Sequence, residues 1–156
     1  MQRLHSLLLL LALALTAALQ ADEIKHRFLC CDYGGNKVCI VNAEGKIEWQ
    51  TEAKHPQDCW LLPSGNVLFA YVGGAKEVSP DQTVAWEYKA PEKGVECHAA
   101  QPLPNGNVLI VECGSSRLIE VDRAGKIAKE IALVTKPEVK MHNQYRGARK
   151  LGNGHY

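Results

Sequence analysis

The chain has 156 residues, of which 46% are hydrophobic and 22% are charged. This composition is typical of one globular domain and excludes a disordered or fibrous chain. With 18 Lys and Arg residues against 17 Asp and Glu, the formal net charge is +1, which lacks the basic excess of proteins that bind nucleic acids or anionic membranes. We therefore expect no nucleic-acid partner.

Residues 1–21 have the pattern of a secretory signal peptide. A short basic start at Met1 to Arg3 precedes an unbroken apolar run from Leu7 to Leu15, and small residues then lead to Ala21. The run is shorter than the roughly 20 residues of a membrane-spanning helix, and an uncleaved N-terminal anchor is the alternative. We expect cleavage after Ala21, a mature chain of residues 22–156, no membrane association after cleavage, and a secreted or periplasmic location.

A repeat with an offset of 41 residues dominates the remaining chain. The sequence Leu-Pro-Ser-Gly-Asn-Val-Leu at residues 62–68 recurs as Leu-Pro-Asn-Gly-Asn-Val-Leu at residues 103–109, and a degenerate copy begins at Leu151. Pro presets the backbone for a turn and Gly supplies a positive φ, so each copy predicts a tight turn between two strands. A second motif, at residues 41–49, 78–86 and 121–129, alternates with the first.

Short β-rich runs between these turns predict strands in chain order. We expect three strands in residues 27–50, four in 58–89, four in 98–133, and the start of a further set in 146–156. No segment after the signal peptide has the apolar spacing of an amphipathic helix. Four antiparallel strands in about 41 residues make one propeller blade. The predicted fold is therefore all-β, a partial β-propeller of about three four-stranded antiparallel blades.

The predicted ring is incomplete, because propellers close with about four to eight blades. An open arc leaves two apolar blade faces uncovered. We interpret the chain as an N-terminal part of a longer protein. Its missing C-terminal blades would then complete the ring and supply the fourth strand of the first blade. A ring assembled from several copies is the alternative.

The sequence Gly-Lys-Ile-Glu-Trp at residues 45–49 resembles the docking motif Gly-Lys-x-x-Trp of quinoprotein-like repeats. Together with the Leu-Pro-x-Gly-Asn-Val-Leu turns, residues 27–156 resemble a secreted bacterial PQQ-binding-like β-propeller repeat protein. The resemblance implies that Trp49 and Trp86 pack between blades as structural docking residues. The third copy departs from the motif with Lys129. The resemblance does not imply a quinone, and without a full cofactor constellation we do not expect PQQ.

Candidate site residues cluster before the strand that would be innermost in each blade and would line the channel. They are His55, Asp58, Glu96, His98, His142 and Arg146. Because His55, His98 and His142 are 43 and 44 residues apart, close to the repeat length, we expect them to share one rim. Three imidazoles could hold a divalent metal such as Zn²⁺ or act as general acid and base. Histidines that only hydrogen-bond loops are the alternative.

The function predicted from this rim is that of a binding module for a small molecule, a glycan or a protein. Arg146 could pair with a carboxylate or sulfate of the ligand. The alternative is a propeller enzyme: a metal- or His-dependent lyase, transferase or hydrolase, or a PQQ-dependent oxidoreductase. The chain has no Ser-His-Asp arrangement that would favour an enzyme, and a fold by itself does not define a function.

The chain contains six cysteines: Cys30, Cys31, Cys39, Cys59, Cys97 and Cys113. Export would expose them to an oxidising compartment that allows disulfides. Cys59 and Cys97 precede or begin innermost strands of adjacent blades and are the first pair to consider, with buried thiols as the alternative. Cys30 and Cys31 are neighbours on a predicted strand, so we expect two small buried side chains on opposite faces.

Overall fold

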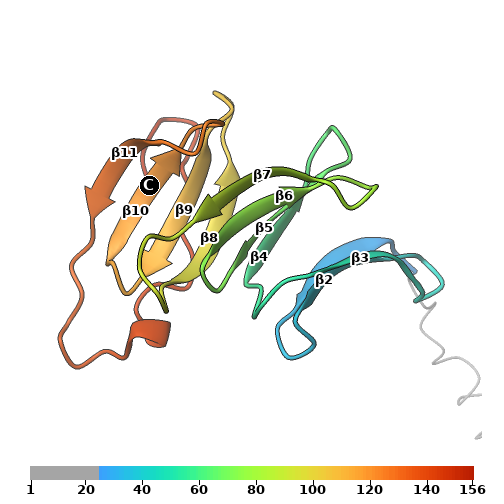
Figure 1. Ribbon diagram of the computed structural model, residues 1–156, viewed down its shortest axis with the longest axis horizontal. Helices are drawn as coiled ribbons and strands as arrows, with labels where there is room; N and C mark the ends of the chain where they lie inside the picture. The colour runs from blue at the N-terminus through green and yellow to red at the C-terminus, as the bar shows by residue number, and fades with distance from the viewer. Residues whose placement is uncertain (1–24) are drawn as a thin grey trace, which may run out of the picture.

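The computed structural model describes residues 25–156, which form three antiparallel sheets standing side by side (Figure 1). The first sheet contains β1 (Phe28–Asp32), β2 (Lys37–Val41) and β3 (Ile47–Glu52). The second contains β4 (Asp58–Leu61), β5 (Val67–Tyr71), β6 (Gly74–Val78) and β7 (Val84–Lys89). The third contains β8 (Glu96–Pro102), β9 (Val108–Cys113), β10 (Arg117–Val121) and β11 (Ile127–Ala132). The prediction of an all-β partial propeller is confirmed.

Outside the sheets, the described residues contain one short 3-10 helix, η1 (Met141–Asn143). Between Lys25 and Tyr156 no helix is long and apolar enough to cross a membrane. The predicted signal peptide, residues 1–21, lies outside the described residues.

The repeated Leu-x-x-Gly turns have the same hydrogen bond across the turn in all three copies. The amide of Leu62 donates to the carbonyl of Asn66 at 2.8 Å, Leu103 donates to Asn107 at 2.8 Å, and Leu151 donates to His155 at 2.7 Å. Each turn needs a left-handed residue, supplied by a glycine with φ between 86° and 88°, a conformation that a Cβ would strain. The third copy therefore forms the turn although no strand pairs beside it.

The second motif forms the turn between the last two strands of each sheet. A β-bulge precedes this turn at the same position in all three sheets, between Ile40 and Val41 in the first. The left-handed residue is Gly45 in the first sheet and Gly125 in the third, whereas the second sheet uses Gln82 with φ 71°. The second copy of the motif lacks this glycine, and its turn keeps the same shape because Gln82 adopts the strained left-handed conformation.

Apolar side chains fill the two junctions between the sheets. Between the second and third sheets the core includes Leu68, Trp86, Tyr88 and Ile110. Trp86 is almost fully buried, and its Nε1 donates to the carbonyl of Asp122 in the third sheet at 3.0 Å. Between the first and second sheets the half-buried Trp49 packs in a separate cluster. Each blade is thus stabilised by burial against its neighbour, as in other propellers.

The registers show which strand the first sheet lacks. β1, β2 and β3 pair with each other as β5, β6 and β7 do, with the bulge at the same place. Within residues 25–156 the first sheet therefore contains no counterpart of β4 or β8, the strands that the sequence places innermost.

The C-terminal segment lies against the third sheet. Lys150 exchanges two hydrogen bonds with the side chain of Gln101 in β8. The Lys150 ammonium and the Tyr156 hydroxyl both contact Glu120 of β10. Residues 146–156, predicted to start a further blade, contain the repeated turn but no assigned strand.

Candidate functional site

The candidate site lies where β8, the segment before β4 and the C-terminal segment meet. Glu96 and His98 are two residues apart in β8, next to a bulge between Cys97 and Ala99. His142 comes from η1 and Arg146 from the coil that follows it. The short helix and the coil after it therefore bring His142 and Arg146 next to β8, a strand whose position is set by the repeat.

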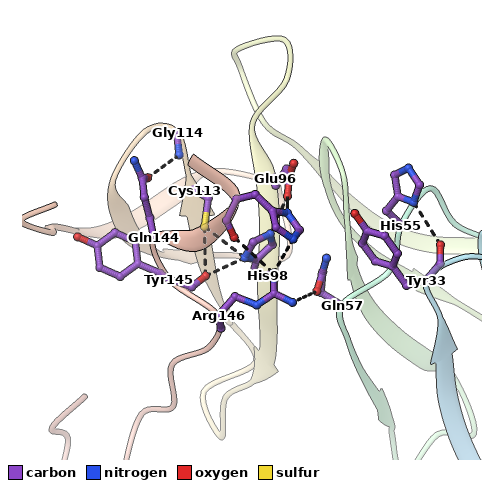
Figure 2. Close-up of polar contacts among 11 residues, drawn as sticks. Tyr33, His55, Gln57, Glu96, His98, Cys113, Gly114, Gln144, Tyr145 and Arg146 are labelled. Carbon is purple, nitrogen blue, oxygen red and sulfur yellow. Dashed lines mark hydrogen bonds and ion pairs between the residues drawn. The ribbon is translucent and has the colours of Figure 1, made fainter. Parts of the chain in front are cut away.

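The carboxylate of Glu96 is the centre of the group (Figure 2). Its Oε2 accepts hydrogen bonds from His98 Nε2 at 2.8 Å and from His142 Nδ1 at 2.6 Å. Burial alone would raise the pKa of Glu96, but the hydrogen bonds from the two histidines outweigh it and lower this pKa below its ordinary value. The folded site therefore favours an ionised carboxylate.

His98 is the most deeply buried member, with 1% of its surface exposed. Its Nδ1 lies 2.8 Å from the carbonyl oxygen of Tyr145, and the Cys113 sulfur lies 3.1 Å from the same oxygen. Both ring nitrogens of His98 thus face oxygen atoms of neighbouring groups. The ring is held from two sides, which fixes its orientation.

Arg146 is a cation with neutral partners. Its Nη1 donates to His142 Nε2 at 2.9 Å, and its Nη2 donates to the amide oxygen of Gln57 at 3.2 Å. Across residues 25–156 no carboxylate forms an ion pair with its guanidinium. The bond from Arg146 requires an unprotonated Nε2, so His142 carries its proton on Nδ1, the atom facing Glu96.

Asp58 holds the sheets together beside this group. Its two oxygens pair with the guanidinium of Arg149 at 3.0 and 3.1 Å. One oxygen also accepts the backbone amide of Ala100 in β8 at 3.2 Å. The carboxylate is therefore engaged in joining β4, β8 and the C-terminal segment.

His55 lies apart from the other predicted histidines (Figure 2). Its Nδ1 is 3.2 Å from the carbonyl oxygen of Tyr33, and its ring stacks on the Tyr33 ring at 4.5 Å between centroids. The other edge of Tyr33 faces His142 at 6.3 Å. The side chains whose ligand atoms all lie within 4.8 Å of one another are instead Glu96, His98 and His142.

The repeat explains why the histidine spacing does not place His55 with the others. Counted back from the leucine that begins each turn, Gln57, His98 and Arg146 all stand five residues before it, whereas His55 matches Glu96 at seven. Gln57, which sequence reasoning missed, is thus the counterpart of His98 and Arg146. Counting from the turn would have found it.

A pocket of about 490 Å³ opens beside these side chains. Its lining consists of Gln57, Asp58, His98, Arg146, Gly147, Ala148 and Arg149. Two guanidinium groups and one histidine therefore face a single carboxylate, which Arg149 already neutralises. Among the charged groups that line the pocket, the Arg146 guanidinium is therefore the one without a partner of opposite charge in residues 25–156.

The six cysteines are all free thiols. The Cys30 and Cys39 sulfurs lie 3.3 Å apart as cross-strand neighbours of β1 and β2. Cys31 and Cys59 both pack in the core cluster between the first and second sheets. Cys97 is fully buried in the other cluster, between the second and third sheets, so Cys59 and Cys97 lie in different cores.

No protein-family profile matches the chain, and no curated protein matches it either.

Solved structures with a similar fold do match. A protein of unknown function from Bacteroides caccae has 28% sequence identity and a TM-score of 0.68, and the match covers 83% of this chain and 48% of that one. Virginiamycin B lyase from Staphylococcus aureus has 17% identity and a TM-score of 0.55, covering 72% and 40%. The WD40 β-propeller domain of Doa1 has 18% identity and a TM-score of 0.56, covering 70% and 37%. The chain spans less than half the length of each, and the likeness concerns the propeller fold rather than a PQQ-binding-like subgroup.

Proposed function

We propose that this chain is a propeller binding module whose channel-mouth pocket takes a small organic anion. The observation that carries the proposal is Arg146, a guanidinium at the pocket wall whose hydrogen-bond partners are the neutral side chains of Gln57 and His142. A carboxylate would replace these weak bonds with a charge-assisted, two-pronged contact. Because the neighbouring Arg149 is already paired with Asp58, Arg146 supplies the specificity for negative charge.

The surrounding contacts favour a preformed site. His98 is held by Glu96 and by the Tyr145 carbonyl, and the amide of Gly114 anchors the side chain of Gln144 at 3.2 Å. The segment that carries Arg146 is therefore tied to the third sheet on both sides. A ligand does not have to order this segment, which lowers the cost of binding.

Calorimetric titration with succinate tests the proposal. An arginine–carboxylate contact of about 1.5–3 kcal/mol predicts that Arg146→Gln raises the Kd by roughly 10- to 100-fold. The matched control is Arg27→Gln, an exposed arginine paired with Glu48 on the first sheet, which should leave the Kd unchanged. Equal affinity of wild type and Arg146→Gln would refute the proposal.

A divalent transition metal is the second candidate ligand, and the convergence of Glu96, His98 and His142 favours it. His98 Nδ1 faces a backbone carbonyl, as the second nitrogen of a metal-bound histidine usually does, so its Nε2 is oriented toward the metal position. Zn²⁺ binding measured by calorimetry should disappear in Glu96→Gln and persist in the exposed control His155→Ala. Zn²⁺ binding that survives in Glu96→Gln would exclude this site.

Two further parts of the proposal concern the whole protein. We infer that further blades complete the ring, because the matched propellers are more than twice as long as the matched segments and the first sheet lacks one strand. A secreted or periplasmic location is consistent with the N-terminal sequence. Fractionation of the expressing cells and the mass of the protein isolated from them test both points.

A further inference from the structure

A second pocket, of about 910 Å³, lies between the first and second sheets and shares no lining residue with the pocket at Arg146. Strand β3 and the loop after it contribute Thr51, Lys54 and His55, and the second sheet contributes Phe69, Tyr71 and Lys76. At the other junction, between the second and third sheets, the side chains pack into one buried cluster that includes Leu68, Tyr88 and Ile110. The difference between the two junctions therefore needs a cause in the side chains.

The repeat identifies the side chain that fills the other junction. Tyr88 pairs with Ala75 in the second sheet as Thr51 pairs with Val38 in the first. The Tyr88 ring is buried, and its hydroxyl donates to the fully buried Glu112 at 2.6 Å. The first sheet thus has a small threonine where the second has a ring that crosses to its neighbour.

The second sheet, which faces the first, also differs from the third sheet at the matching positions. The repeat places Tyr71 of β5 at the position of Glu112 in β9, and the strand registers place Lys76 at the position of Ile119. Lys76 carries its ammonium 5.3 Å from the centre of the Tyr71 ring. The third sheet thus has a buried acid and an isoleucine at the positions where the second sheet has an aromatic ring and a cation.

Three lysines are among the residues that line this pocket. Lys37, Lys54 and Lys76 line it, against the single carboxylate of Glu52. Lys76 is 3.3 Å from Glu87, and Lys37 is 3.8 Å from Asp32, while no ion pair of Lys54 is found in the part of the chain that the structure describes. The pocket therefore combines an aromatic wall with two half-buried, paired lysines and the exposed Lys54.

We propose that this inter-blade pocket, bounded by Thr51, Tyr71 and Lys76, is a second binding site that takes an organic anion with a flat aromatic part. The aromatic part packs against Tyr71 in the space that Tyr88 occupies at the other junction, and the negative group faces Lys54 and Lys76. Ring packing on an aromatic wall and a charge-assisted contact supply the affinity. This site is independent of the anion site at Arg146.

Fluorescence titration with 1-anilinonaphthalene-8-sulfonate, an aromatic sulfonate, tests the site. Wild type should bind one molecule with enhanced emission. Thr51→Tyr restores the ring of the other junction, so it should raise the Kd at least tenfold and leave the melting temperature unchanged or higher. The matched control Thr51→Ser keeps the pocket open and should bind as wild type does. Unchanged binding in folded Thr51→Tyr would overturn the proposal.

Two other variants keep the proposal testable if Thr51→Tyr does not fold. Lys54→Glu reverses an exposed charge without touching the core and should weaken binding by roughly fivefold or more, so an unchanged Kd would overturn the proposal. Arg27→Gln, on the first sheet and outside this pocket, should bind the probe as wild type does. Loss of binding in Arg27→Gln would place the probe outside this pocket and also overturn the proposal.

Discussion

Removing the Tyr88 hydroxyl should destabilise the fold, because this group satisfies a carboxylate that water does not reach. Glu112 has 0% exposure, and its two oxygens bond the Tyr88 hydroxyl at 2.6 Å and Arg117 Nε at 2.6 Å. Tyr88→Phe keeps the ring in place and deletes one charge-assisted hydrogen bond. We expect a loss of about 2 kcal/mol in the free energy of unfolding and a melting temperature lower by roughly 6 °C.

Tyr71→Phe is the matched control for this prediction. The Tyr71 hydroxyl donates to Glu87 at 3.0 Å, but Glu87 is partly exposed and has two lysine partners. Water and the lysines compensate for the lost bond, so we expect less than about 1 kcal/mol. Urea denaturation followed by tryptophan fluorescence measures both variants. Equal losses in the two variants, or a loss below about 0.5 kcal/mol in Tyr88→Phe, would refute the reasoning.

Three further predictions address the site, the thiols and the sheet. Because the pKa of Glu96 is lowered, the ionised carboxylate stabilises the fold above the ordinary value of 4.5, and this contribution is lost as the pH falls below that value. The free energy of unfolding of Glu96→Gln, measured from pH 6 to pH 3, should therefore decline less steeply than that of wild type. Parallel curves for the two proteins would contradict this prediction. The hydrogen bond from a neighbouring thiol outweighs burial and lowers the pKa of Cys59, so mass spectrometry should find Cys59 alkylated first by iodoacetamide, and faster modification of another cysteine would contradict it. A Cβ at Gly74 would lie 2.0 Å from the backbone oxygen of Tyr88, so Gly74→Ala should cost more than about 2 kcal/mol, whereas Gly147→Ala, with open space around it, should melt like wild type.

The strands and turns could be predicted because local chemistry determines them. A glycine at a fixed place in each turn, preceded by a proline in the first two copies, determines the backbone of the turn, and the β-rich runs between the turns form the strands. The same turn forms even at Leu151, where no strand pairs beside it. A repeated local signal therefore identifies the blade without knowledge of its neighbours.

The membership of the site could be predicted only in part. Glu96, His98, His142 and Arg146 do lie together, but His55 does not, because the histidine spacing ignored the loop lengths between blades. Helix η1, which carries His142, has no counterpart in the repeat and no periodic pattern to reveal it. Side chains delivered by an irregular segment cannot be located by periodicity.

The junctions between blades were also beyond sequence reasoning. The second motif aligns Thr51 with Tyr88 along the sequence, but only the packed sheets show that the Tyr88 ring crosses to Glu112 of the neighbouring blade. The contact between Cys30 and Cys39, by contrast, follows from a hairpin that turns between Asp32 and Lys37. Pairs within one hairpin can be counted along the chain, whereas contacts between sheets depend on how the blades pack.

The proposed anion site is tested most directly by the NMR signal of the Arg146 Nε–H group during a titration with succinate. The account predicts that this signal shifts and saturates with the calorimetric Kd, while the signal of Arg27 on the first sheet stays in place. An Arg146 signal that does not move at saturating succinate, or one that moves together with Arg27, would contradict the assignment of this pocket as the binding site.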